Sequence, residues 1–155
     1  MKVLILYFSK TGHTLEAANA TSEGIRSAGA EAELVTVSDF QASMLADYEG
    51  LIVGSPCWAG SLTSTGVAKP ILRAVDSLPP DCLKGKRCGG FSVHSQMGGE
   101  TTVTYLGTLL SQKGCEDYRP GPTAQAGVPF SLWKGASVGS GDEARFKAYG
   151  AEFVV

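Results

Sequence analysis

The apolar segment at residues 2–8 is the feature that most constrains how this chain of 155 residues can fold. From Val3 to Phe8 every side chain is apolar or aromatic, so neither face of a strand made from them would suit water. Such a run is typical of a strand that is buried on both faces, as the strands of parallel sheets are. Parallel neighbours need crossover connections, which are usually helices. The segment therefore predicts an α/β protein.

Strand and helix patterns alternate along the rest of the chain, which predicts βαβ units, a parallel sheet and helices on both of its faces. Ser38 and Asp39 are suited to cap a further short helix ending near Ala46. Pro70 falls inside one of the helical segments. The strand patterns occupy residues 31–37, 51–53 and 87–93, and the helical patterns occupy residues 14–28, 64–77, 102–112 and 142–153.

Charge and hydropathy exclude several classes of protein. Acidic residues outnumber basic ones 15 to 13, for a net charge of −2, so the chain lacks the Lys/Arg excess of a nucleic-acid binder. The apolar runs have the length of strands, too short to insert in a membrane, and the start of the chain does not resemble a signal peptide. We therefore expect no nucleic-acid partner, no membrane insertion and a single domain over residues 1–155.

The cysteines point to a reducing compartment and not to a metal. They have irregular spacing, form no C-x-x-C pair and have no histidine at ligand spacing, so we expect no metal site. Isolated thiols without an export signal suit the cytoplasm. The four residues are Cys57, Cys82, Cys88 and Cys115.

Three glycine-containing loops are expected at the carboxyl ends of the first, third and fourth strands. They span residues 9–14, 54–61 and 94–99. Doubly wound sheets bind ligands at this edge, where the strand order reverses. Glycine is also abundant, at 20 of 155 residues, and close backbone approach to a ligand would explain part of that excess. The glycines placed in these loops are Gly12, Gly54, Gly60, Gly98 and Gly99.

The first loop has the chemistry of a phosphate site. Ser9, Thr11 and Thr14 offer hydroxyl donors, Gly12 lets successive N–H groups converge, and a helix N-terminus follows. The loop matches neither a Walker sequence nor G-x-G-x-x-G. It is therefore either a phosphate site built from neutral donors or an ordinary strand-to-helix turn.

The second and third loops suit an aromatic heterocycle. Trp58 is either a flat wall for a ring or a packing residue. Cys57 beside it is interpreted as a small packing residue in preference to a nucleophile, since no base lies nearby in the sequence. His94 is either a proton donor or cofactor contact, or a structural residue. The backbone N–H groups and the Gln96 amide of the third loop could bond the polar edge of a heterocycle.

Taken together, these loops resemble those of the flavodoxin-like FMN proteins, and the resemblance extends over essentially the whole chain. Its motifs are the segment from Tyr7 to Thr14, the segment from Asp47 to Pro56, and Leu83-Lys84-Gly85-Lys86. The resemblance implies a doubly wound, five-stranded parallel sheet of order 2-1-3-4-5 that binds FMN noncovalently. The phosphate would lie on the first loop, and the isoalloxazine ring between the other two.

The resemblance also implies a set of cofactor-binding residues and assigns none to catalysis, because the flavin itself would carry the redox chemistry. Within the segment 116–140, a flap over the flavin edge and a plain surface excursion are both open. The flap would use Pro120, Pro122, Pro129, Phe130 and Trp133. The cofactor-binding set is Ser9, Lys10, Thr11, Gly12, His13, Thr14, Pro56, Cys57, Trp58, Ala59, Gly60, His94, Ser95, Gln96, Met97, Gly98 and Gly99.

Three functions are compatible with these residues. The favoured one is a flavodoxin-type electron carrier that works with a redox partner protein, which the short chain favours. The second is an NAD(P)H:quinone oxidoreductase of the WrbA type, which the chain resembles at residues 12–14, 98–102 and 127–137. The third is an interaction module that has the fold and either lacks FMN or senses it. For the first two we expect a monomer or a small homo-oligomer.

Overall fold

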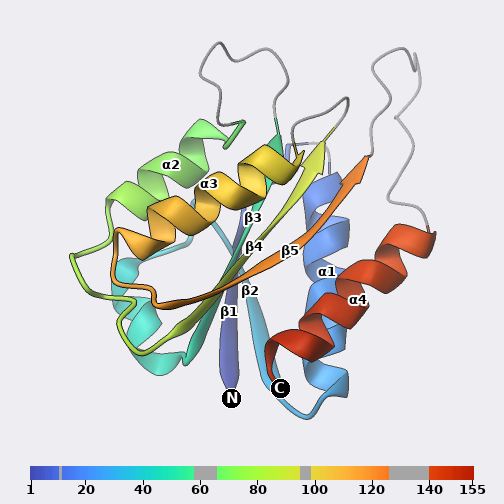
Figure 1. Cartoon of the computed structure of the whole chain (residues 1–155), viewed down its shortest axis with the longest axis horizontal. Helices are drawn as coiled ribbons and strands as arrows, with labels where there is room; N and C mark the ends of the chain where they lie inside the picture. Colours follow the sequence, from blue (N-terminus) through green and yellow to red (C-terminus); the bar gives the residue numbers. More distant parts are fainter. Residues whose placement is uncertain (11, 58–65, 95–98, 126–139) are drawn as a thin grey trace.

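The computed structural model describes residues 1–10, 12–57, 66–94, 99–125 and 140–155. The strands form a five-stranded, all-parallel sheet in the order β2-β1-β3-β4-β5 (Figure 1). This confirms the predicted α/β class and the strand order that the resemblance implied. In chain order the elements are β1 (Lys2–Tyr7), α1 (His13–Ser27), β2 (Glu31–Thr36), a 3-10 helix (Ala42–Asp47), β3 (Gly50–Cys57), α2 (Lys69–Asp76), β4 (Arg87–His94), α3 (Gly99–Ser111), β5 (Asp117–Gln125) and α4 (Ser140–Phe153).

Helices cover both faces of the sheet, as predicted: α1 and α4 lie on one face, and α2 and α3 on the other (Figure 1). Strand β1 shows why its sequence is apolar throughout. Leu4 and Leu6 pack with the α2–α3 core, and Val3 and Ile5 pack with the α1–α4 core. All four side chains are fully buried, so neither face of the strand is exposed to solvent.

Helices α1 and α4 pack side by side through glycine (Figure 1). A Cβ on Gly24 would collide with the Lys147 carbonyl of α4, and a Cβ on Gly150 would collide with the Thr21 carbonyl of α1. The two backbones therefore approach more closely than any side chain would allow. This contact fixes α1, whose N-terminus follows the first loop, against the C-terminal helix.

The short helix after β2 differs from its prediction. Ser38 and Asp39 do not cap it, because both take part in a turn in which the Thr36 hydroxyl lies 2.9 Å from Ser38 Oγ and donates to Asp39 Oδ2 at 3.2 Å. The helix is a 3-10 helix, and it follows Gln41, whose backbone is extended and whose side chain makes no capping bond.

Helix α2 begins later than predicted, because Pro70 lies in its first turn. Proline lacks an N–H and suits only the first helical positions. The residue before the helix, Ala68, has an extended backbone with ψ 137°. The prediction of a helix from residue 64 with an internal proline is therefore wrong.

Strands β3 and β4 run further than predicted, so Gly54, Pro56, Cys57 and His94 lie in strands and not in loops. Packing in the core explains why residue 54 is glycine. A Cβ there would collide with the ring of Phe91 on the neighbouring strand. Gly54 therefore makes room for the core and is not part of a glycine cradle for a ligand.

Residues 117–125 form the edge strand β5, which places Pro120 and Pro122 in the sheet and contradicts their proposed role in a flap. The sequence Pro120-Gly121-Pro122 looks unlike a strand, but an edge strand tolerates proline because one side of it needs no N–H donor. The other residues of the proposed flap, Pro129, Phe130 and Trp133, lie outside the described residues.

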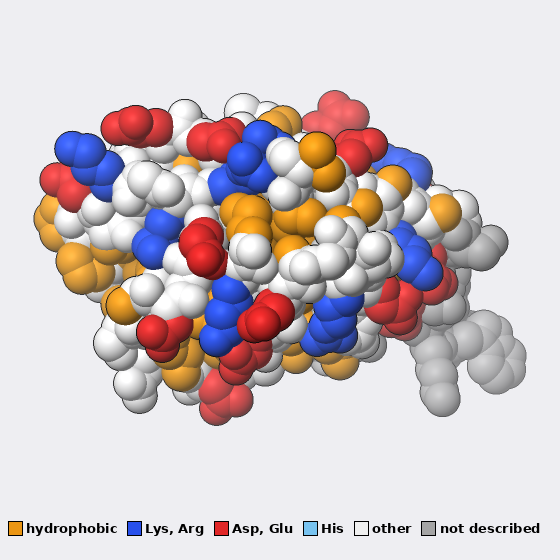
Figure 2. Space-filling model, turned by 90° about the horizontal axis from the view of Figure 1, so that it is seen from below, with side chains coloured by type: hydrophobic (Ala, Val, Ile, Leu, Met, Phe, Trp, Pro, Cys, Tyr) orange, Lys and Arg blue, Asp and Glu red, His pale blue; other side chains and the backbone are white. Residues whose placement is uncertain are grey.

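The face at the amino ends of the strands carries mixed charge, with Lys/Arg and Asp/Glu side chains interspersed around an apolar centre (Figure 2). A cavity of about 320 Å³ opens there. Its cations already have partners, since Lys86 Nζ donates to the Tyr48 carbonyl at 2.6 Å and Arg87 Nε donates to Asp117 at 3.1 Å. The cavity is lined by Met1, Glu49, Gly85, Lys86, Arg87, Glu116 and Asp117.

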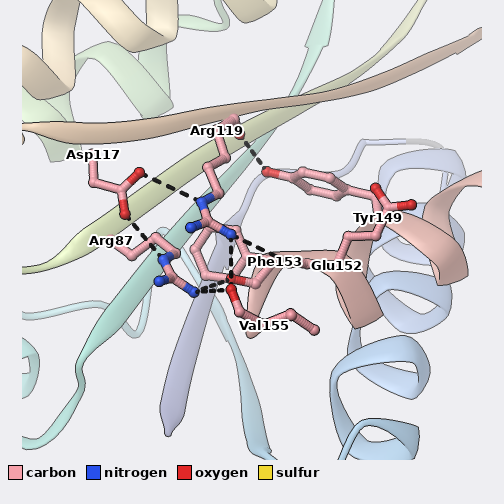
Figure 3. Close-up of polar contacts among 7 residues, drawn as sticks. All are labelled: Arg87, Asp117, Arg119, Tyr149, Glu152, Phe153 and Val155. Carbon is pink, nitrogen blue, oxygen red and sulfur yellow. Dashed lines mark hydrogen bonds and ion pairs between the residues drawn. The ribbon is translucent and has the colours of Figure 1, made fainter.

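Two arginines anchor the end of α4 to the sheet (Figure 3). Arg87 Nη1 of β4 donates to the Phe153 carbonyl at 2.7 Å, and Arg119 Nη1 of β5 donates to the Glu152 carbonyl at 3.4 Å. Asp117 accepts from both guanidinium groups. The bond from Arg87 satisfies the Phe153 carbonyl at the end of the helix, and the bond from Arg119 adds to the one that the Glu152 carbonyl accepts from the Val155 N–H at 3.2 Å.

Among the described residues, no helix has the length and apolar character needed to cross a membrane.

Candidate functional site

The candidate site lies at the carboxyl edge of the sheet, where β1 and β3 are neighbours. From β1 the chain crosses to β2 on one side, and it later continues through β3 to β4 and β5 on the other. This reversal is the topological switch point at which doubly wound sheets bind ligands. Residues 8–10, Gly12, the ends of β3 and β4, and the N-termini of α1 and α3 all reach this edge.

The first loop places backbone donors around a hydroxyl oxygen. Ser9 Oγ accepts from the N–H of Gly12 at 3.0 Å and from that of Leu15 at 3.4 Å. Gly12 has a φ of +91°, which glycine tolerates, and the turn there brings the first turn of α1 over Ser9. N–H groups that converge on one oxygen at a helix N-terminus are the donor set that a phosphate requires. The described part of the loop therefore fits a phosphate group.

His13 and Thr14 belong to the first turn of α1, and both are buried. His13 is 9% exposed, and its Nδ1 atom lies 3.8 Å from Glu16 Oε1 without making a hydrogen bond. Lys10, by contrast, is exposed on the turn before the helix. The loop thus offers two buried polar side chains near the helix end and one exposed cation.

The ends of β3 and β4 lie next to each other at this edge. Cys57 and His94 are register partners, and His94 is also paired with Gln125 of β5. A Cβ on Gly99 would lie 2.5 Å from Cδ2 of the His94 ring and 2.9 Å from Cβ of Thr123. Only glycine at the start of α3 therefore leaves room for the imidazole. The Nδ1 atom of His94 is buried without a hydrogen-bond partner.

The structure brings together the described members of the predicted cofactor set at one edge: Ser9, Lys10, Gly12, His13, Thr14, Pro56, Cys57, His94 and Gly99. Sequence reasoning missed Ser55, Gly66 and Thr102, of which Gly66 lies between Cys57 and Thr102, and Ser55 bonds to Ala68, next to the bridge partner of Cys57. No local pattern marks them, because their contacts depend on the strand register and on how α3 crosses the sheet. The remaining predicted members lie outside the described residues, and they are Thr11, Trp58, Ala59, Gly60, Ser95, Gln96, Met97 and Gly98.

The buried ionisable groups with raised pKa values lie away from this edge. Burial raises the pKa of the Cys88 thiol, near the start of β4, and the neighbouring Cys115 raises it further. Burial also raises the pKa of Tyr118 and Tyr149, whose hydroxyls donate to backbone carbonyls. These groups are held in their neutral forms and serve packing. The described residues contain no cluster of His, Cys, Asp and Glu that could hold a metal.

Comparison with known proteins identifies the family. The family model of the flavodoxins matches residues 5–148. The chain belongs to the flavodoxin family, whose cofactor is FMN. The phosphate donors of the first loop fit this cofactor, and the edge formed by β3 and β4 lies beside them.

Relatives of two kinds resemble the chain. An NAD(P)H dehydrogenase (quinone) of Chromohalobacter salexigens is 32% identical over 84% of this chain and 72% of its own length. A flavodoxin of Megasphaera elsdenii is 31% identical over 70% of this chain and 84% of its own. The chain spans only 62% of the length of several further relatives named NAD(P)H dehydrogenase (quinone).

Solved structures support the same fold. Oxidised flavodoxin 1 of Bacillus cereus superposes with a TM-score of 0.76 over 99% of this chain and 97% of its own, at 24% identity. At this level of identity the likeness shows the fold alone.

Proposed function

We propose that this protein is an FMN-dependent electron carrier that passes electrons between redox partner proteins. The observation that carries this proposal is the similarity to a flavodoxin of Megasphaera elsdenii, which is 31% identical and is matched over 84% of its own length. This similarity in sequence supports the role of a flavodoxin.

Bound FMN supplies one- and two-electron redox chemistry, and the protein supplies its position and surroundings. In this proposal Ser9, Thr11, Gly12 and Thr14 would hold the phosphate through hydroxyl and backbone donors, with His13 and Lys10 beside it. Pro56 to Gly60 would hold one side of the ring system. Residues 94–99 would hold the other side and offer N–H groups to its polar edge.

No described residue has to act as a general acid or base in this role. An electron carrier needs a bound flavin whose edge a partner can approach, and no group of the protein is consumed. We further propose that the protein works in the cytoplasm, because its four cysteines are free thiols, which suits a reducing compartment.

A second function, an NAD(P)H:quinone oxidoreductase, is favoured by one specific observation. The relative that matches 84% of this chain is named as such an enzyme. In this case NAD(P)H and a quinone would replace the partner proteins, with the same residues around the FMN.

Steady-state kinetics separate the two functions. The FMN-loaded protein is mixed with NADPH and benzoquinone, and in a parallel assay with NADPH, a flavodoxin reductase and cytochrome c. A carrier reduces cytochrome c only when the reductase is present and oxidises NADPH with benzoquinone no faster than free FMN does. Rapid NADPH oxidation with benzoquinone and no reductase would overturn the carrier proposal in favour of the enzyme.

A further inference from the structure

The two ends of the segment 58–65 are held together by residues on either side of it. Cys57, the last residue of β3, forms an antiparallel bridge with Val67. The next residue, Ala68, donates its N–H to Ser55 Oγ at 3.0 Å. The Ser55 hydroxyl in turn donates to the Pro56 carbonyl at 2.8 Å. Ser55 is fully buried, so water cannot replace these bonds if its hydroxyl is removed.

Gly66 joins the same contact to helix α3. Its φ is +68°, and a Cβ built on it would lie 2.5 Å from Thr102 Oγ1 and 2.6 Å from Cys57 Sγ. Both distances start from the same Cβ position, so the Thr102 hydroxyl and the Cys57 sulfur lie within about 5 Å of each other. Thr102 is fully buried and belongs to the first turn of α3.

These four residues, Ser55, Cys57, Gly66 and Thr102, form what we call the loop junction. It contacts both ends of the segment 58–65 through β3 and the start of α2. Through Thr102 it also contacts α3, which begins directly after the segment 95–98. The junction therefore connects the anchor points of the second and third loops.

We propose that Ser55 and Thr102 are positioning residues for the flavin ring, acting through the loop junction. The inference rests on the proposed function, because residues 58–60 and 95–98 are the segments proposed to flank the ring. By holding the anchor points of both segments at one place, the junction sets their separation. Loss of the junction therefore weakens binding of the ring and leaves the phosphate contacts unchanged.

The test compares Ser55→Ala and Thr102→Val with Ser92→Ala. Ser92 is a matched control, because it is the register partner of Ser55, is equally buried, and has a hydroxyl without a hydrogen-bond partner. FMN-free proteins are titrated with FMN and with riboflavin, and flavin fluorescence is recorded well below the melting temperature of each variant.

For Ser55→Ala and Thr102→Val we expect the Kd values of FMN and of riboflavin to rise by the same factor. For Ser55→Ala that factor is about tenfold, the effect of losing the buried hydrogen bond that Ser55 Oγ accepts from the Ala68 N–H. The ratio of the two Kd values then stays at that of the wild type. Ser92→Ala should stay within about twofold for both ligands, since it breaks no bond. A purely structural role would lower the melting temperature and leave both Kd values unchanged.

Two results would overturn the inference while leaving the proposed function intact. One is a wild-type Kd for both ligands in Ser55→Ala and Thr102→Val. The other is a loss confined to FMN, which would assign these residues to the phosphate. If the wild type itself binds neither ligand, the proposed function fails, and the inference fails with it.

A second measurement covers the case in which Ser55→Ala does not fold. In a Trp133→Phe background Trp58 is the one remaining tryptophan, so its fluorescence is recorded without interference. Thr102→Val and Ser55→Thr are made in this background in place of Ser55→Ala. We expect the emission maximum of Trp58 in the FMN-free protein to shift in Thr102→Val and to stay unchanged in Ser92→Ala. An identical emission spectrum in both would contradict control of this segment by the junction.

Discussion

At the residue scale, the phosphate end of the proposed site depends on a few neutral groups. Ser9 Oγ marks the point where the N–H groups of Gly12 and Leu15 converge, at 3.0 and 3.4 Å. A phosphate oxygen is satisfied by the same kind of donors, and the positive end of the α1 dipole strengthens them. A single hydroxyl should therefore have a measurable effect on FMN binding.

We expect Ser9→Ala to raise the Kd of FMN about tenfold, or about 1.4 kcal/mol, because a hydrogen bond to a charged group is lost. Riboflavin has no phosphate, so its Kd should not change. Fluorescence titrations with both ligands measure this difference, and Ser111→Ala, an exposed serine at the end of α3, is the control. An equal change for riboflavin and FMN would show that Ser9 does not act on the phosphate.

The residue scale is also where the sequence was least informative. The hydroxyls of residues 9–14 could be assigned to a phosphate because they are adjacent in the chain and precede a helix. Ser55 and Thr102 could not be assigned, because their contacts join residues far apart in sequence. Gly54 was misassigned for the same reason, since its neighbour Phe91 lies on another strand.

At the scale of elements, the packing of α1 against α4 is the most demanding contact in the described structure. Gly24 and Gly150 each face a backbone carbonyl of the other helix, Lys147 and Thr21 respectively. A backbone cannot yield as a flexible side chain can, so an added methyl group must push the helices apart.

We expect Gly24→Ala and Gly150→Ala each to lower the free energy of unfolding by about 1–3 kcal/mol or more, the cost of overpacking a core. Gly141→Ala in the first turn of α4 is the control, because a Cβ there meets open space. That variant should be neutral or slightly more stable, since alanine favours the helix. Urea unfolding curves measure all three, and equal stability of Gly24→Ala and Gly141→Ala would contradict the close approach.

The anchor of α4 predicts a dependence on pH. The hydrogen bond from Arg87 lowers the pKa of Asp117 in the folded state (Figure 3). The contribution of Asp117 to stability is therefore present above its pKa in the unfolded chain, about 3.9, and is lost as the pH falls through the lower folded value.

The melting temperature of Asp117→Asn should thus lie below that of the wild type near pH 7. The difference should shrink as the pH is lowered below about 4, because the wild type then loses the charge that the variant lacks. Thermal unfolding between pH 7 and pH 2.5 measures it. A difference that stays constant over this range would contradict the role of the Asp117 charge.

Several elements were predictable because their signals are local. The apolar run in β1 and the helical spacing of α1 each indicate an element without knowledge of the rest. Strand β5 was not predicted, because Pro120 and Pro122 argue against a strand unless its place at the sheet edge is known. The start of α2 was predicted at residue 64, with Pro70 inside the helix, because the sequence alone does not show that Pro70 lies in its first turn.

At the scale of the whole molecule, the two ends of the parallel strands have different roles. The amino edge carries mixed charges, and its Arg87 and Arg119 side chains donate hydrogen bonds to carbonyls at the end of α4. The carboxyl edge gathers the phosphate donors, the ends of β3 and β4, and the loop junction. Family membership fixes the cofactor as FMN, and the edge with these groups is where we propose that it binds.

The most direct test of this account is a titration of the FMN-free protein with FMN, in which the quenching of flavin fluorescence reports binding. We expect saturation at one FMN per chain, with a Kd in the micromolar range or below, about −8 kcal/mol or stronger. The absence of any quenching at micromolar concentrations of folded protein and FMN would contradict the central claim.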